Sequence, residues 1–271
     1  MDILGVQVSL QVSSSWGVTV HLAPEARKLA VWVTSVAQVL EVQAVTVAFM
    51  LKLVGRLSFA AFAIWGGQAR ARLRSLYTFC LSGCGRAPCQ VLQSLRWWSA
   101  RLLSASSVTV QPSPVCFQPL VVYTDAEGSA GFGVTIHDGL ENRWVAGSFP
   151  VAVRSVLNGR RTQIFPYEVM AVWVAIRQFI DQMSGRVVLF FVDNTSALAS
   201  IAKGSTRCGD VQPIIADIWD TLVAGHVWSH WKWVPSKLNL SDLPSRGKPP
   251  ILGQQCPCRV RMEKLAALIS S

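Results

Sequence analysis

The strongest constraint on how this chain folds is an uninterrupted run of six apolar residues, 187–192, that ends at Asp193. A run without polar alternation is typical of a central strand that is buried on both faces. Asn194 or Thr195 can cap a following helix, and Gly204 can end it. Ligands of open α/β sheets gather outside the carboxyl ends of such strands, so Asp193 is a candidate site residue. A helix-capping role alone is the competing interpretation of Asp193.

Composition indicates a globular chain with an anionic partner. Its 271 residues include 51% hydrophobic residues and 11 tryptophans, enough for one large domain or two ordinary ones. The net charge is +10, and residues 1–120 carry ten Lys and Arg against three acidic residues. A basic half of this kind indicates a phosphate backbone or an anionic surface as partner, although a solvated helix face would give the same count.

Cysteine usage and hydropathy predict an intracellular protein without a membrane span. The seven cysteines are odd in number and lack the spacing of a disulfide framework or a zinc knuckle, which favours the cytoplasm or the nucleus. Residues 29–51 form the one membrane-like run, with Glu41 as its only charge. Because Gln38, Glu41 and Gln43 interrupt the middle of this run, we expect no span there.

The first part of the chain, residues 1–103, is expected to form a small, mainly helical module. Apolar and polar residues alternate from Val6 within residues 3–12, which predicts a half-buried strand. Helices are expected from Pro24, from near Thr46 to residue 62, over 69–79 and over 91–103. Residues 104–117 are rich in Ser, Thr and Pro and are predicted to be a linker.

Residues 118–247 are expected to form an α/β domain, followed by a C-terminal tail over 248–271. Three strands with short links, 120–125, 131–137 and 142–149, predict an antiparallel meander. The order continues with a helix from Pro166 to about residue 183, the strand before Asp193, two helices, a strand over 228–234 and a helical turn near Ser241. Strands joined through helices lie parallel, so the predicted sheet is mixed.

Four carboxylates are candidate site residues: Asp125, Glu168, Asp193 and Asp242. Three of them lie at ends of predicted elements that can converge on one edge of the sheet. Each of the four has an ordinary explanation as a turn, first-turn or capping residue. Clustered carboxylates repel one another, however, so four of them at one sheet edge are stable only with cations among them. Ligands that are all oxygen select hard divalent ions, here two Mg²⁺ or Mn²⁺, and the implied reaction is hydrolysis of a phosphodiester.

Four motifs in this order resemble the RNase H domain of retrotransposon reverse transcriptases. They are residues 123–133 (YTDAEGSAGFG), 166–168 (PYE), 191–197 (FVDNTSA) and 236–246 (SKLNLSDLPSR). The resemblance covers about residues 118–247 and implies an RNase H-like five-stranded mixed sheet with flanking helices. It also implies cleavage of the RNA strand of an RNA/DNA hybrid, with the strands distinguished by the 2′-hydroxyl.

The resemblance also implies a role for each candidate residue. Asp125 would bridge both ions, Glu168 and Asp193 would complete the leaving-group side, and Asp242 would hold the ion that activates water. Asn194 and Ser196 would contact the substrate. One departure is that the loop before Asp242 lacks the histidine that many relatives carry there.

The first part of the chain is similar, less specifically, to the thumb and connection helices of the same enzymes. The similar segments are residues 4–6 (LGV), 53–60 (LVGRLSFA), 69–74 (ARARLR) and 95–98 (LRWW). Between Ile3 and Thr124 there is no Asp, and the only acidic residues are Glu25 and Glu41, so no two-metal polymerase site can form there. The chain therefore resembles the C-terminal part of a larger polyprotein.

Two other functions remain open at this point. A hybrid-binding or assembly module could keep the fold and lack turnover, although the presence of all four acids favours an enzyme. A transposase or integrase of the same superfold would normally have three acids with a different final spacing. Trp231 and Trp233 could stack on nucleotides, but they share one strand face and are expected in the core.

Overall fold

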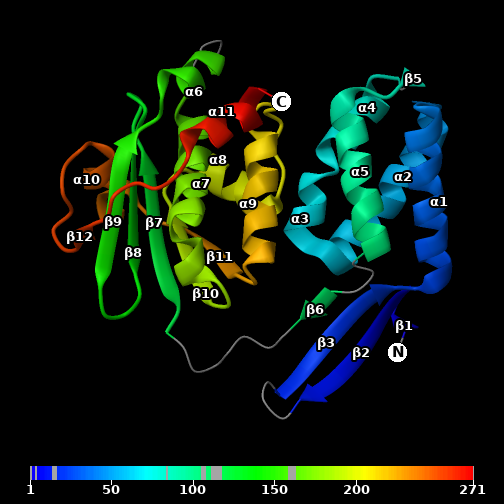
Figure 1. The fold of residues 1–271 in the computed structure, drawn as a ribbon, viewed down its shortest axis with the longest axis horizontal. Coiled ribbons are helices and arrows are strands. Elements are labelled where there is room, and N and C mark those ends of the chain that lie inside the picture. Colours follow the sequence, from blue (N-terminus) through cyan, green and yellow to red (C-terminus); the bar gives the residue numbers. More distant parts are fainter. Residues whose placement is uncertain are drawn as a thin grey trace. The chain divides into compact units, whose positions relative to one another are not determined.

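A computed structural model describes residues 2–3, 5–13, 17–83, 85–104, 108–110, 118–157 and 163–270. The chain divides into two compact units, residues 1–112 and 113–271 (Figure 1). The predicted linker over 104–117 falls largely outside the described residues. Its described part includes β6 (Val108–Val110), which pairs with a strand of the first unit.

The first unit begins with a hairpin of β2 (Val6–Ser13) and β3 (Gly17–Pro24), flanked by β1 (Asp2–Ile3) and β6. The alternating pattern predicted β2, whereas no strand was predicted over the residues of β3. In the structure Pro24 pairs with Val6, and α1 (Ala26–Val42) begins two residues later.

Helices make up most of this unit, as predicted. They are α1, α2 (Val47–Ala60), the π-helical turn η1 (Ala61–Trp65), α3 (Gly66–Ala71), α4 (Arg74–Leu81) and α5 (Cys89–Ser104). Two short strands, β4 (Ala44–Val45) and β5 (Gly85–Arg86), pair with each other. The side chains of Leu53, Leu57 and Trp98 are fully buried in the core that these helices share.

The membrane-like run over residues 29–51 is divided between two helices. Gln43 adopts a left-handed conformation, with φ of 54°, and ends α1. The side chain of Thr46 then caps α2 by accepting a hydrogen bond from the Phe49 amide. Among the described residues, one helical stretch, Val47–Ala71, is long and apolar enough to cross a membrane by length and composition alone.

The second unit contains a mixed six-stranded sheet with the order β11-β10-β7-β8-β9-β12. Its strands are β7 (Leu120–Ala126), β8 (Gly131–His137), β9 (Asn142–Ser148), β10 (Val187–Val192), β11 (Trp228–Trp233) and β12 (Gln254–Gln255). β7, β8 and β9 form the antiparallel meander, while β10 lies parallel to both β7 and β11. The predicted mixed α/β class is confirmed, with β12 as an additional edge strand.

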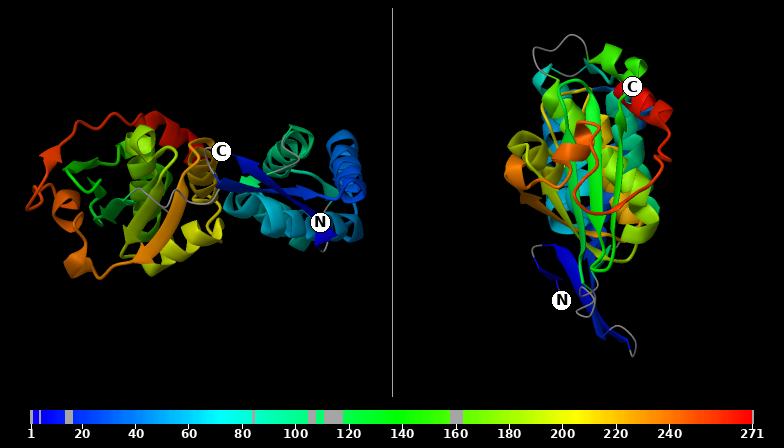
Figure 2. Two further views of the ribbon diagram at one scale, coloured as in Figure 1. Left: turned by 90° about the horizontal axis from the view of Figure 1, so that it is seen from below. Right: turned by 90° about the vertical axis from the view of Figure 1, so that its left-hand side faces the viewer.

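Helices cover one face of the sheet, and a short helix lies on the other (Figure 2). The covering helices are α7 (Ile164–Met183), α8 (Thr195–Lys203) and α9 (Gln212–Ala224). The short helix α10 (Asp242–Ser245) follows the 3-10 turn η2 (Ser236–Leu238) and packs on β7, β8 and β9. Helices α7 and α8 pack on β10, whereas α10 packs on β7, β8 and β9. The expectation that β10 is buried on both faces is therefore wrong. Val188, Phe190 and Val192 are buried, whereas the residues between them are half-buried.

Two helices were not predicted: α6 (Val151–Val156) and α11 (Met262–Ser270). Residues 248–271, treated as a tail in the sequence analysis, contain β12 and α11. Leu265 and Ile269 of α11 are buried in the core of the second unit. Lys264 of the same helix lies 3.0 Å from Oδ1 of Asp217 on α9. These residues therefore belong to the packed unit.

Candidate active site

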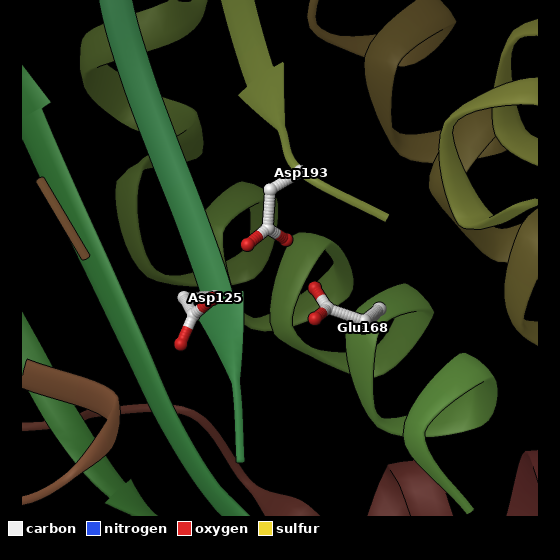
Figure 3. A group of neighbouring side chains, drawn as sticks. All are labelled: Asp125, Glu168 and Asp193. Atoms are coloured by element: carbon white, nitrogen blue, oxygen red, sulfur yellow. The ribbon is translucent and has the colours of Figure 1, made fainter. Parts of the chain in front are cut away.

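Three of the four predicted carboxylates meet where β7 and β10 end (Figure 3). Asp125 is the last residue but one of β7, Asp193 directly follows β10, and Glu168 lies near the start of α7. Each offers one oxygen, and these three oxygens lie within 4.8 Å of one another. The sequence placed these residues up to 68 positions apart, and the fold brings them to one point.

The parallel pairing of β7 and β10 explains why Asp125 and Asp193 meet. Thr124 pairs with Val192, so the residues that follow them, Asp125 within β7 and Asp193 just after β10, lie side by side. Residues two apart on a strand share a face. On the face that carries both aspartates, the ring of Tyr123 stacks on that of Phe191 with centroids 4.9 Å apart. By this rule Asp125 shares a face with Tyr123, as the sequence analysis expected.

Glu168 is more deeply buried than the sequence suggested. The helical periodicity placed it at the edge of an apolar stripe, but residues 166–176 of α7 are buried around the whole helix. The sheet contacts one side of α7, and α8 and α9 contact others. Only 3% of Glu168 is exposed, and its Oε2 atom has no hydrogen-bond partner.

Burial and repulsion hold Glu168 in its protonated form. Burial is the largest cause that raises its pKa, to about 9, and the charges of Asp193 and Asp125 raise it further. A buried carboxyl group with a free oxygen beside two other carboxyls is unfavourable for stability. Such groups are concentrated at functional sites, where a ligand compensates for the cost.

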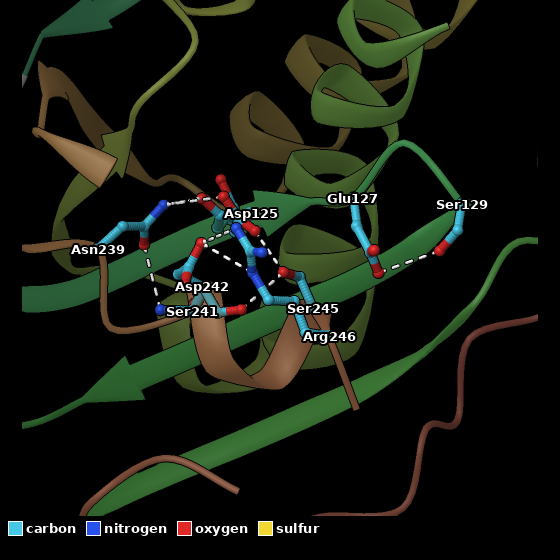
Figure 4. Close-up of polar contacts among 9 residues, drawn as sticks. Asp125, Glu127, Ser129, Asn239, Ser241, Asp242, Ser245 and Arg246 are labelled. Carbon is cyan, nitrogen blue, oxygen red and sulfur yellow. Dashed lines mark hydrogen bonds and ion pairs between the residues drawn. The ribbon is translucent and has the colours of Figure 1, made fainter. Parts of the chain in front are cut away.

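Asp125 is fixed by two side chains from the segment around α10 (Figure 4). Ser245 Oγ donates a short hydrogen bond to Oδ2, and Asn239 Nδ2 donates to Oδ1 over 3.4 Å. Burial is the main cause that raises the pKa of Asp125, to about 7. The Ser245 hydrogen bond lowers it, and the charges of Asp193 and Asp242 raise it. Two oxygens are therefore held in place before any ligand arrives.

Asp242, the fourth predicted acid, lies nearby but outside the group of three. It begins α10, and its Oδ1 accepts hydrogen bonds from Arg246 Nε at 3.2 Å and Nη2 at 2.8 Å. The spacing of four residues between Asp242 and Arg246 was the available sequence signal for this pair, but it was not used, because such pairs are common on helix surfaces. The charge of Asp242 still acts on Asp125.

The two predicted substrate residues stand at the start of α8. Oδ1 of Asn194 accepts hydrogen bonds from the amides of Ser196 and Ala197, at 3.1 and 3.0 Å, so Asn194 is the helix cap. Ser196 is exposed beside it. Gly204, with φ of 77°, ends the helix as expected.

Sequence analysis missed three residues that shape the site. Asn239 and Ser245 fall within the motif around Asp242, yet only Asp242 was singled out there. Trp233 was expected in the core with Trp231. Instead it is 53% exposed, and its Nε1 donates to the carbonyl oxygen of Asp193 at 3.0 Å. Trp231 is half-buried and stacks on Phe190. The polar neighbours of the motif were the available signal for the first two residues.

The acidic group fits a divalent metal ion. Asp125, Glu168 and Asp193 supply only oxygen ligands, which suits Mg²⁺ or Mn²⁺. The unpartnered Oε2 of Glu168 is one ligand position that the protein itself leaves unsatisfied. No other group of three or more potential metal ligands occurs among the residues that the structure describes.

Comparisons with known proteins give a structural neighbour and no sequence relative. No family model and no curated protein match the chain. Among solved structures, the chain is similar to the N-terminal RNase H domain of a Mycobacterium tuberculosis protein, determined as a fusion with maltose-binding protein. The two are 13% identical, with a TM-score of 0.36, and the similarity covers 56% of this chain and 99% of that one.

Proposed function

We propose that this protein hydrolyses the RNA strand of RNA/DNA hybrids with divalent metal ions. The observation that carries the proposal is the convergence of Asp125, Glu168 and Asp193, from three separate elements, with oxygens within 4.8 Å of one another. The four motifs that resemble retrotransposon RNase H domains, which include these residues, supply the expected substrate.

The carboxylates would hold the ions, and the ions would supply charge neutralisation and activation of water at a phosphodiester. Asp125 is oriented for this role by Ser245 and Asn239, so its oxygens lose little freedom on binding. Glu168 would release its proton to water when a cation occupied the site, because the positive charge would offset the burial and the repulsion that raise its pKa. Trp233 donates a hydrogen bond to the main-chain carbonyl of Asp193 and so helps to position the backbone that carries this carboxylate.

Asp242 would complete the site after a change of rotamer. Ser241 fixes the segment that precedes α10: its Oγ donates to the Tyr123 carbonyl at 2.9 Å and lies in hydrogen-bond contact with Thr135 Oγ1 at 3.1 Å. Since Asp242 directly follows this anchored residue, its side chain can turn without movement of the main chain. The ion pair with Arg246 is partly exposed, so little stability is lost when it opens.

The first unit offers a surface for the nucleic acid backbone. A cavity of about 610 Å³ between α1 and α2 is lined by four cations, with no acidic residue among the lining side chains. The cations are Arg27, Lys28, Lys52 and Arg56. We propose that this basic groove binds the phosphates of the hybrid, in keeping with the thumb-like and connection-like sequence of this unit.

A cleavage assay tests the proposal directly. A hybrid labelled on the RNA strand should be cut in the presence of Mg²⁺, and chelation or Asp193→Asn should abolish cutting. A duplex of DNA alone is the substrate control. If the intact protein binds the hybrid and never cuts it at any Mg²⁺ or Mn²⁺ concentration, the chain is a binding module and the nuclease assignment is wrong.

A further inference from the structure

Arg246 is a cation placed at the rim of an acidic site. Its guanidinium donates to Asp242 through Nε and Nη2, and 55% of its side chain remains exposed. Its charge also interacts with those of Asp125 and Glu127. Among the described residues, no other cation forms an ion pair with Asp125, Glu168, Asp193 or Asp242. Arg246 therefore supplies the positive charge that the structure places against this site.

The position of Arg246 is fixed through the main chain around it. Ser245, its neighbour in sequence, donates its one hydroxyl hydrogen to the Asp125 carboxylate, and the Asp242 carbonyl oxygen lies 2.9 Å from the same Oγ. Gly133 on β8 lies against the main chain of Ser241 and Ser245, and this close approach is possible because glycine has no side chain. The start of the Arg246 side chain is thus held close to Asp125, while its guanidinium reaches solvent.

A substrate phosphate meets an electrostatic obstacle at this site. A phosphodiester carries a negative charge and would approach three or four carboxyl groups, so it needs a cation on the protein as well as the metal ions. A guanidinium has five N–H donors in a planar fork, and phosphate oxygens match that geometry. Arg246 donates to Asp242 through two nitrogen atoms, Nε and Nη2. An oxygen of a phosphate can take the place of the carboxylate oxygen that accepts these hydrogen bonds.

We propose that Arg246 binds a phosphate of the substrate, and that Asp242 occupies its guanidinium until a metal ion binds. In the metal-free protein Asp242 and Arg246 neutralise each other. When a divalent ion takes the Asp242 carboxylate, the guanidinium is released and binds a phosphate of the nucleic acid beside the acidic site. This inference rests on the proposed nuclease function and adds a residue that couples metal binding to substrate binding.

Two measurements on Arg246→Gln in the full-length chain test the exchange, and neither depends on turnover. The first is hybrid affinity in Ca²⁺, a divalent ion that oxygen ligands bind, measured by fluorescence anisotropy over a range of salt concentrations. It is compared with the affinity in EDTA, where Asp242 still occupies Arg246 and the substitution should have little effect. In Ca²⁺ we expect a Kd about 3- to 10-fold higher and a salt slope reduced by about one phosphate contact. The second is a Mn²⁺ titration followed by thermal unfolding. We expect half-saturation at an ion concentration about 2- to 10-fold lower, because Asp242 no longer has a competing partner.

The opposite directions of these two effects separate the exchange from a structural role. A variant that was merely misfolded would lose affinity for both the hybrid and the ion. Arg143→Gln is the matched control, because Arg143 also pairs with a neighbouring acid, Glu141. Arg143 lies at the start of β9, whereas the end of that strand is the part near the site. This variant should leave both measurements unchanged. Arg246→Lys should keep part of the hybrid affinity, since the charge remains and the planar fork is lost.

The outcomes also distinguish this inference from the proposed function. If the natural chain cuts the hybrid and Arg246→Gln binds the hybrid equally well in Ca²⁺, Arg246 has no role with phosphate and only this inference is wrong. Weaker Mn²⁺ binding by Arg246→Gln would likewise overturn the exchange. A natural chain that neither binds nor cuts the hybrid would overturn both proposals.

Discussion

Gly133 lies against the main chain of Ser245, so that a Cβ at position 133 would come within 2.5 Å of the Ser245 nitrogen. The same Cβ would meet the carbonyl oxygen of Ser241 at 2.5 Å. Gly133 also pairs with Asp125 across β7 and β8. The absence of one side chain therefore lets α10 approach the sheet and brings Ser245 to the Asp125 carboxylate.

We expect Gly133→Ala to displace α10 and impair the site. The backbone atoms that it meets cannot move as a flexible side chain can, so the free energy of unfolding should fall by about 1–3 kcal/mol. Cleavage of the hybrid should fall more than 10-fold, because Asp125 loses the hydrogen bond from Ser245. Urea unfolding and a cleavage assay measure the two effects.

Gly128→Ala is the matched control for this substitution. Gly128 lies in the turn between β7 and β8, where an added Cβ would meet nothing within 4 Å. Its stability should change by less than about 0.5 kcal/mol and its activity should be preserved. Equal behaviour of the two variants would show that α10 does not depend on close approach at Gly133.

Glu168→Gln should stabilise the metal-free protein while it abolishes cleavage. Glu168 is buried with an unpartnered oxygen, and an amide removes an ionisable group from this place. We expect the free energy of unfolding in EDTA at pH 8 to rise by about 1–3 kcal/mol. The exposed Glu141→Gln is the control and should have little effect. A less stable Glu168→Gln variant would contradict the view that this carboxyl group is held at a cost.

The metal-free protein should become less stable as the pH rises from about 5 to about 9. The pKa of Glu168 is raised to about 9 in the folded chain, from an ordinary value of 4.5, so the folded state binds the proton more tightly than the unfolded state. Stability from this proton is complete below the ordinary pKa and is lost as the pH rises through the folded value. Thermal unfolding in EDTA at several pH values measures the trend.

The same pH series with Mg²⁺ and with Glu168→Gln identifies the group. A divalent ion stabilises the charged carboxylate, so Mg²⁺ should reduce the loss of stability at high pH. Glu168→Gln should reduce the pH dependence without any metal. If the variant keeps the full pH dependence of the natural chain, another group is responsible.

Asp217 should be the main electrostatic contact that holds α11. Trp173 Nε1 donates to its Oδ2 at 2.7 Å, Arg177 pairs with the same oxygen, and Lys264 of α11 lies 3.0 Å from Oδ1. Burial would raise the pKa of Asp217, but hydrogen bonds from Arg177, Trp173 and Lys264 outweigh this effect and lower it. We expect Asp217→Asn to reduce the free energy of unfolding by about 1–3 kcal/mol.

Hydrogen exchange should show which part of the molecule Asp217→Asn loosens. Amides of α11 should exchange faster than in the natural chain, because the partner of Lys264 has lost its charge. Asp181→Asn, an exposed acid on α7, is the control and should leave α11 unchanged. If the α11 amides exchange at the same rate in both variants, the apolar burial of Leu265 and Ile269 alone holds this helix.

Local sequence patterns determined the elements that surround the site. The apolar run before Asp193 predicted β10, and Asn194 and Gly204 predicted the start and end of α8. Such signals act between neighbours along the chain, through capping bonds and side-chain periodicity, so they can be read without a tertiary structure. β3 was not predicted, although Val18, Val20 and Leu22 alternate with polar residues and were the available signal.

The sequence alone nominated Asp125, Glu168, Asp193 and Asp242, but only the tertiary structure decided how they are arranged. The parallel register of β7 and β10 brings Asp125 and Asp193 together, and the cover of α7 on all sides buries Glu168. The fourth acid, Asp242, lies outside the group and pairs with Arg246. Burial and the resulting pKa shifts depend on atoms from distant segments, so no local pattern could contain them. The pair of Asp242 with Arg246, four residues along the chain, is the local exception.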